Sequence, residues 1–184
     1  MWLLLMTVLI NELPNAWGLS ETESALVGTI LMVGFLVGAY IWGYTSDKYG
    51  RLFAFRKTLL LAGLAGIGAA LSVNLPMLLI FCLIAGIGIG GDIPVDGSVF
   101  IEFWSVSARW RMVALCVVSG LGSVIIPLFA YICFVSDLPQ VWRLVTAFNW
   151  FLNLLFWIPR YYVYETPKFL ASKNRWDEAK EVLK

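Results

Sequence analysis

Long apolar segments separated by short polar joints account for most of this chain. A transmembrane helix needs about 20 predominantly apolar residues. Segments of this length, or close to it, cover residues 24–45, 58–73, 77–104, 112–135 and 141–164. In lipid every backbone N–H and C=O must be bonded within the protein, so these segments predict helices rather than strands. The pattern therefore predicts an all-α membrane protein.

The two ends of the chain depart from this pattern. Residues 1–10 are apolar but too short to cross a bilayer, and we interpret them as the end of a truncated first span. Residues 11–23 are polar and predict a loop. Residues 165–184 are polar, with apolar side chains at helical spacing, and predict an amphipathic segment that follows a helix bundle over residues 1–164.

The composition agrees with a membrane protein. The 184 residues are 60% hydrophobic and only 14% charged, whereas soluble domains average about 25% charged residues. The net charge of +1 argues against a nucleic-acid partner. The chain has no histidine, and its cysteines lie in apolar runs without metal-binding spacing, so we expect no metal site and no cofactor. We also expect no enzyme activity, because no nucleophile is accompanied by an evident activating base.

The basic residues are distributed unevenly between the two sides of the predicted spans. Nearly all of them fall in the joints 46–57 and 105–111, at the end of the last span, or in residues 165–184, and Arg143 lies near the opposite side. Membrane loops rich in lysine and arginine stay on the cytoplasmic side. We therefore expect both joints and the segment 165–184 to be cytoplasmic.

The joint between the first two complete spans concentrates charge in a chain where charge is scarce. Gly50 permits a tight turn, and Asp47 and Arg51, four residues apart, can pair across one turn of helix. Further charges of both signs occur on the same side: Glu102, Arg109, Glu165 and Lys168. We interpret this layer as a gate whose charges bridge helix ends when the cytoplasmic side is closed. The alternative is a generic anchoring belt, which explains the cations but not the acids.

The span 77–104 is unusually polar and rich in glycine. Gly86 and Gly90 have the small-xxx-small spacing that lets two membrane helices approach closely. Pro94 removes one helical hydrogen bond and is expected to kink or loosen the span. The glycines superficially suggest a nucleotide-binding loop, but such a loop follows a strand in a βαβ unit, and the neighbours here are long apolar helices.

Two acids, Asp92 and Asp96, flank this proline on one face of the predicted helix. A carboxylate at bilayer depth costs about 2.5–3.5 kcal/mol, so both side chains should face water or pair with a cation. We interpret them as candidates for contact with a cationic substrate or for proton coupling. The alternative is that they bond to neighbouring helix ends and hold the kink.

The charged joint resembles a motif of a known family. Gly43, Asp47, Gly50 and Arg51 are similar to the G-x-x-x-D-x-x-G-R signature between the second and third helices of the major facilitator superfamily. Further stretches that resemble motifs of this family follow along the chain, in the same order as in the family.

The glycine-rich span also resembles a part of this family. The run Gly86–Gly97, with Glu102 and Arg109 after it, is similar to the fourth helix and following loop of the sugar-porter and organic-ion branches, above all the synaptic-vesicle-protein-like group. Residues 165–170 resemble the Glu-Ser-Pro-Arg-x-Leu motif that follows the sixth helix.

The resemblance implies a secondary transporter that works by alternating access between two six-helix halves. It places one set of residues in a cytoplasmic lock: Gly43, Asp47, Gly50, Arg51, Glu102, Arg109, Glu165 and Lys168. The expected substrate is a small polar or charged organic solute, and Asp92 and Asp96 point to a cation or proton as its partner. The coupling ion, and the choice between uniport and symport, stay open.

Only the amino-terminal six-helix bundle is expected here, with its first helix truncated. Transport then needs a second half, either six carboxy-terminal helices or another copy of the chain. The alternative function is that of a truncated half-transporter, which acts only as a partner or regulatory subunit or is inactive.

Overall fold

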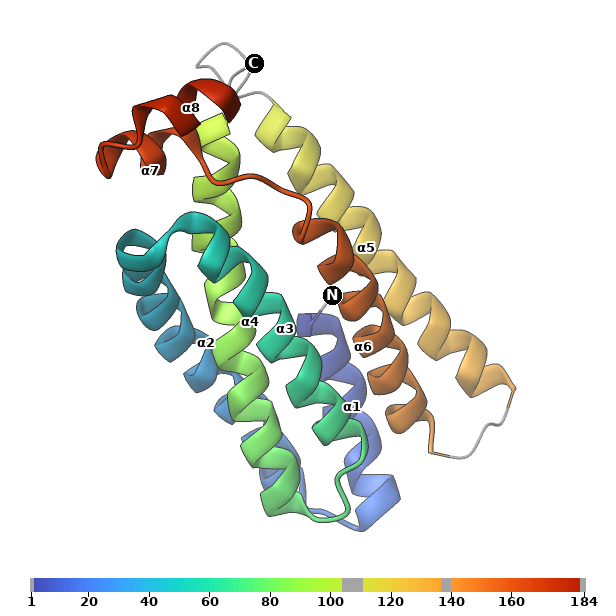
Figure 1. Cartoon of the computed structure of the whole chain (residues 1–184). Helices are drawn as coiled ribbons and strands as arrows, with labels where there is room; N and C mark the ends of the chain where they lie inside the picture. The colour runs from blue at the N-terminus through green and yellow to red at the C-terminus, as the bar shows by residue number, and fades with distance from the viewer. Residues whose placement is uncertain (1, 104–110, 137–139, 183–184) are drawn as a thin grey trace.

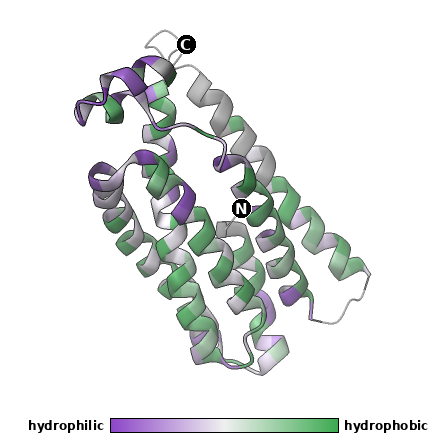
Figure 2. Ribbon diagram, in the orientation of Figure 1, coloured by the Kyte–Doolittle hydropathy of each residue, from purple (hydrophilic) through white to green (hydrophobic). Residues whose placement is uncertain are grey.

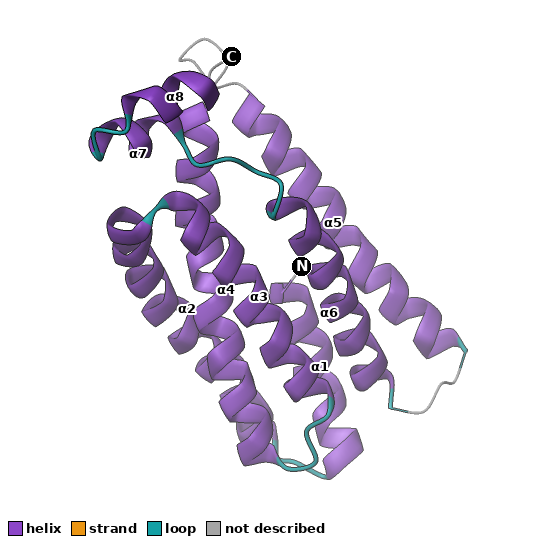
Figure 3. Ribbon diagram, viewed as in Figure 1, coloured by secondary structure: helices purple, strands orange, loops and turns teal. Residues whose placement is uncertain are grey.

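The computed structural model describes residues 2–103, 111–136 and 140–182. Within these residues the chain forms helices and connecting loops and no strands (Figure 1, Figure 3). The helices in chain order are α1 (Trp2–Trp17), α2 (Glu21–Tyr49), α3 (Arg51–Ala70), α4 (Leu75–Phe103), α5 (Arg111–Val135), α6 (Val141–Arg160), α7 (Pro167–Ser172) and α8 (Trp176–Val182). The predicted all-α class is confirmed.

Four of the described helices, α2, α3, α4 and α6, are long and apolar enough to cross a membrane. In α5 the stretch Ser123–Val135 is also apolar but shorter. The long helices run beside one another as a bundle, and α7 and α8 lie at one end of it, which we call the α7 end (Figure 1). Hydrophobic residues dominate the length of the bundle and hydrophilic ones gather in α7 and α8 (Figure 2). The chain is therefore an integral membrane bundle.

Several helix ends differ from the boundaries that the apolar pattern predicts. Helix α3, for example, begins at Arg51 and not at position 58. Helix α1 continues to Trp17, into the segment 11–23 expected to be a loop, because Leu9 and Leu13 lie one turn apart and are both buried. Helix α6 ends at Arg160, before the predicted position 164. Its last turn contains Pro159, and the Arg56 side chain of α3 binds the carbonyl groups that follow.

Helix α4 packs against α2 through glycines of both helices. A Cβ built on Gly86 or Gly90 would overlap the backbone of α2, and a Cβ on Gly34 or Gly38 would overlap the backbone of α4. On another side α4 meets α3 through Gly88, which is equally close to the α3 backbone. Small residues at these crossings let the helix backbones approach closely. This packing fixes the position of the part of α4 that carries the candidate acids.

The remaining core joins α6 to α1, α5 and α3. Buried apolar side chains from α1 to α6 meet there, among them Leu5 of α1, Ile126 of α5 and Trp142 of α6. Farther along α6, the Trp150 ring lies over Gly66 of α3, where any larger residue would overlap it. Helix α6 is thus held against α3, which brings its end close to the start of that helix.

Candidate functional site

The turn between α2 and α3 is built on Gly50. Its φ of 114° lies in the region that favours glycine, and its N–H completes α2 by donating to the Ser46 carbonyl oxygen at 3.2 Å. A Cβ at this position would also come within 2.7 Å of Glu165 Oε2. Gly50 therefore reverses the chain and at the same time leaves room for a carboxylate.

That carboxylate, Glu165, caps the start of α3. Gly50 precedes the helix and has no side chain to accept hydrogen bonds from the first N–H groups. The Leu52 N–H instead donates to both oxygens of Glu165, at 3.2 and 3.4 Å. A negative charge is stabilised at a helix N-terminus by the unpaired N–H groups and the helix dipole. The contact joins α3 to the segment between α6 and α7.

Arg51, the first residue of α3, joins α2 to α4. Its Nε donates to Glu102 Oε1 at 3.1 Å, and its Nη1 donates to Asp47 Oδ1 at 2.6 Å and Ser46 Oγ at 3.0 Å. Arg51 and Glu102 are largely buried, with side chains 20% and 13% exposed, whereas Asp47 is 67% exposed. Glu102 Oε2 in turn accepts a hydrogen bond from Thr166 Oγ1 at 2.6 Å. These bonds connect the ends of α2, α3 and α4 to the segment before α7.

We call this set of polar side chains the charged network: Ser46, Asp47, Arg51, Glu102, Glu165 and Thr166. Lys168 lies beside it and lines a pocket of about 200 Å³ together with Asp47, Arg51 and Glu102. Gly43 is not part of it, since apart from its own chain neighbours and the nearby backbone of α2 no described atom lies within 4 Å of a Cβ built there. Arg109, also expected in this layer, lies outside the described residues.

Asp92 and Asp96 pair with a cation from another helix. Arg160, at the end of α6, donates from Nη2 to Asp96 Oδ2 at 2.7 Å and from Nη1 to Asp92 Oδ1 at 3.3 Å. Its Nη1 also donates to the Phe55 carbonyl oxygen of α3 at 2.7 Å, and its guanidinium lies 4.2 Å from the centroid of the Phe55 ring. In this acid–arginine cluster, made of Asp92, Asp96 and Arg160, two carboxyl groups thus share one guanidinium.

Asp96 also borders an apolar pocket of about 540 Å³. The pocket is lined by Phe55 of α3, by Phe100, Phe103 and Val99 of α4, and by residues 163 and 164. The second oxygen of Asp96, Oδ1, is buried and has no hydrogen-bond partner among the described residues. Because an unpaired buried acceptor is costly, this oxygen is suited to a proton or to a donor group of a ligand.

The sequence did not single out Ser46, Thr166 or Arg160. Hydroxyl groups carry no pattern that distinguishes a network member from any other serine or threonine. Arg160 could have been identified, because an arginine within a predicted apolar span requires a partner of opposite charge. The two acids of α4 are such partners. The requirement for a cation beside the acids could thus be predicted, although the residue that provides it was not.

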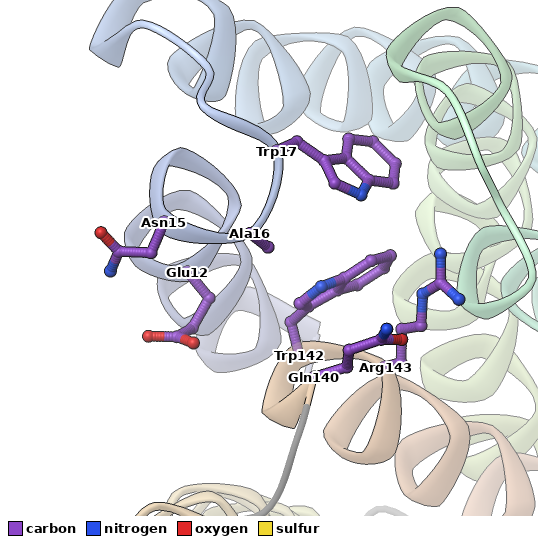
Figure 4. A pocket seen from close by; sticks show the side chains of 7 residues that line it. All are labelled: Glu12, Asn15, Ala16, Trp17, Gln140, Trp142 and Arg143. Atoms are coloured by element: carbon purple, nitrogen blue, oxygen red, sulfur yellow. The ribbon is translucent and has the colours of Figure 1, made fainter.

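A second polar pocket, of about 250 Å³, lies at the opposite end of the bundle between α1 and α6 (Figure 4). Trp17 of α1 and Trp142 of α6 face each other there, with ring centroids 5.3 Å apart and nearly perpendicular planes. Arg143 stacks on Trp142 and donates from Nη2 to the Ser72 carbonyl oxygen at 3.0 Å. These contacts explain the isolated cation on this side as a link between α6 and the end of α3.

Comparison with known proteins gives a family match over the whole chain. The family model described as Major Facilitator Superfamily matches residues 1–184. The Niacin transporter NiaP of Acinetobacter baylyi is 30% identical over 97% of this chain and 39% of its own length. Organic cation/carnitine transporter 7 of Arabidopsis thaliana is 30% identical over 100% of this chain and 36% of its own length. The chain therefore spans less than half the length of these relatives.

Solved structures show the same fold. The xylose transporter XylE from E. coli, in a partially occluded inward-open conformation, superposes with a TM-score of 0.84 over 97% of this chain and 50% of the XylE chain. The sequence identity is 21%, so this likeness concerns the fold and not the solute. The described helices have the arrangement of one half of that structure.

Proposed function

Because this chain belongs to the Major Facilitator Superfamily, we propose that it is the amino-terminal half of a secondary transporter that moves a small polar or charged organic solute by alternating access. The fold, the apolar helices and the relatives named as transporters support membrane transport. The transport cycle requires a second six-helix half, from further carboxy-terminal helices or from another copy.

The charged network is the observation that carries this proposal. It ties the ends of three membrane helices to the segment before α7 through polar contacts of 2.6–3.2 Å. Such contacts can break and re-form as a unit, and alternating access requires an element with two arrangements that a ligand can bias. We assign the α7 end to the cytoplasmic side, because the basic joint 46–57 and the described part of the basic segment, residues 165–182, lie there.

The acid–arginine cluster is the proposed point of contact with a cation or proton. Its two carboxyl groups on a single guanidinium and the unpaired Oδ1 of Asp96 favour a positively charged species beside α4. Arg160 supplies an internal counter-charge that keeps the site stable when no ligand is bound. In this proposal, binding of the solute or a proton weakens the Arg160 contacts and thereby changes the contacts of both α3 and α6 with α4.

An uptake assay tests the role of Asp96. The chain, reconstituted in vesicles, is supplied with labelled niacin and labelled carnitine, the solutes in the names of two relatives. We expect Asp96→Asn to reduce uptake of the transported solute at least about tenfold, equivalent to 1.4 kcal/mol, and to remove its pH dependence. Asp177→Asn, an exposed acid of α8, serves as the control with unchanged uptake. Unchanged uptake and pH dependence in Asp96→Asn would contradict the proposed role.

A second candidate function is that of a partner or regulatory subunit. A single bundle, which covers 39% and 36% of these relatives, forms only one wall of a central pathway. Crosslinking of the reconstituted chain separates the two functions. Uptake together with a crosslinked pair supports transport by two copies, whereas crosslinking to a longer transporter without uptake by the chain alone supports the partner function.

A further inference from the structure

A small basic pocket lies between the start of α3 and the end of α6. Its volume is about 170 Å³, and its lining consists of Phe53, Arg56, Lys57, Leu60, Trp157 and Tyr161. Two of these residues are cations, three are aromatic and none is acidic. The pocket is separate from the acid–arginine cluster and from the charged network, and neither of those sites uses Lys57.

Arg56 is held in a fixed orientation in this pocket. Its Nε donates to the Arg160 carbonyl oxygen at 3.2 Å, and its Nη2 donates to the carbonyl oxygens of Tyr161 and Val163 at 2.8 and 3.1 Å. The guanidinium lies 4.7 Å from the centroid of the Tyr161 ring, and Trp157 Nε1 donates to the Arg56 carbonyl oxygen at 3.0 Å. The cation is thus preorganised by contacts that do not neutralise its charge.

Donor groups are available beside this fixed cation. Within the described residues, Arg56 Nη1 and Lys57 Nζ take part in no hydrogen bond or ion pair. Arg56 and Lys57 line the same pocket, and guanidinium and ammonium groups bind phosphate oxygens in proteins. The pocket therefore has the charge and the donors for a phosphate-sized anion.

The surface that continues from the pocket is apolar and exposed. The side chains that follow Leu60 at three- and four-residue steps are Leu64 and Ile67 of α3 and Leu71 directly after it, which are 56%, 39% and 66% exposed. Phe151 of the neighbouring α6 is 63% exposed. Figure 2 shows the two helices side by side, mainly hydrophobic along their length and hydrophilic near the α7 end. In an integral membrane protein such a surface contacts acyl chains.

We propose that this pocket binds the phosphate group of an anionic membrane phospholipid, whose acyl chains lie along the exposed stripe of α3. Basic pockets between helices at the cytoplasmic surface favour anionic head groups, by about 1 kcal/mol for each lysine or arginine, and tryptophan and tyrosine are enriched at the head-group level. The proposal requires a membrane-embedded bundle but not a transport cycle, so its failure leaves the proposed function unaffected.

Lipid binding to the purified whole chain in detergent tests this inference. Native mass spectrometry compares phosphatidylglycerol, phosphatidylcholine and glycerol 3-phosphate as ligands. We expect phosphatidylglycerol to bind about fivefold more tightly than phosphatidylcholine, and Lys57→Gln to weaken its binding about fivefold. Lys57→Arg should retain binding, and Lys180→Gln, which removes an exposed cation of α8, is the matched control with unchanged affinity.

Three results would overturn the inference. Equal affinity for phosphatidylglycerol and phosphatidylcholine would remove the charge argument, and glycerol 3-phosphate binding as tightly as the lipid would indicate a free-anion site. Equal effects of Lys57→Gln and Lys180→Gln would indicate non-specific attraction to the basic end of the molecule. The comparison of the three ligands uses the unaltered chain, so it tests the preference for an anionic lipid even if a variant fails to fold.

Discussion

The side chain of Arg160 links three helices through ion pairs and a hydrogen bond. From the end of α6 it bonds to both acids of α4 and to a backbone carbonyl of α3. The sequence predicts that Asp92 and Asp96 need water or a cation, because charged groups are costly at membrane depth. It does not identify the cation, since 68 and 64 residues separate the partners and only the folded topology determines which helix ends meet.

Removal of Arg160 should therefore destabilise the bundle. Arg160→Gln leaves two acids without their counter-charge, and breaking a buried pair costs about 3–5 kcal/mol. We expect a smaller loss, about 1–3 kcal/mol, because the Asp96 side chain is 41% exposed. The measurement is the thermal midpoint of the purified chain in detergent, which should fall by several degrees.

A second substitution distinguishes charge from packing in this experiment. If the loss comes from the uncompensated acids, Asp96→Asn added to Arg160→Gln should restore part of the stability. An unchanged midpoint in Arg160→Gln, or no recovery in the double variant, would show that the ion pair does not hold these helices together.

For Glu165, too, the sequence predicts the location of the side chain but not its contact. Its place among the charges of the α7 end follows from its position after the last span. Its specific contact, the cap on the Leu52 N–H, depends on the absence of a side chain at Gly50 and on a contact 113 residues away in sequence. The role of the charged network as a gate stays a prediction.

Among the elements, α4 depends most on close packing. The small-xxx-small spacing of Gly86 and Gly90 predicts a close helix partner, and the structure places both residues against the α2 backbone. The reciprocal pair on α2, Gly34 and Gly38, has the same spacing, so it could have been predicted from the sequence by the same rule. The sequence could not predict which helix α4 contacts, because the spacing rule identifies a packing face and not its partner.

A pair of glycine substitutions on this one helix tests the packing. Gly90→Ala should lower the thermal midpoint in detergent by several degrees, because its Cβ would overlap the Phe35 carbonyl oxygen of α2. Gly97→Ala is the control, since apart from its chain neighbours and the nearby backbone of α4 no described atom lies within 4 Å of its Cβ, and alanine is the better helix former by about 0.5–1 kcal/mol. Equal effects of the two substitutions would contradict close packing at Gly90.

Helix boundaries could be predicted less well than helix existence. Hydropathy predicts α2, α3, α4 and α6 correctly as membrane helices, because lipid leaves few alternatives for a long apolar segment. It misplaces the end of α1, where Leu13 is buried beyond the first polar residues, and the end of α6, where Arg56 binds the released carbonyls. Both helix ends are determined by tertiary contacts, and hydropathy averaged over neighbouring residues contains no information on such contacts.

For the molecule as a whole, the sequence resemblance to the major facilitator superfamily is confirmed by the family match and by the fold. The class follows from composition and span pattern, and the family follows from motifs in their expected order. The solute and the coupling ion do not follow from either, since structures of this fold that share 21% of residues constrain the backbone but not the pathway-lining side chains.

The most direct test of the central claim is the accessibility of Val99, which lies beside Asp96 and is 6% exposed. A Val99→Cys variant, with Cys82, Cys116 and Cys133 replaced by alanine, is treated in vesicles with a membrane-impermeant maleimide from each side. If the charged network holds the α7 end closed, Arg51→Gln should accelerate labelling from that side about tenfold or more, the equivalent of losing 1.4 kcal/mol, whereas Asp177→Asn should leave it unchanged. Equal labelling rates with and without Arg51 would contradict the account.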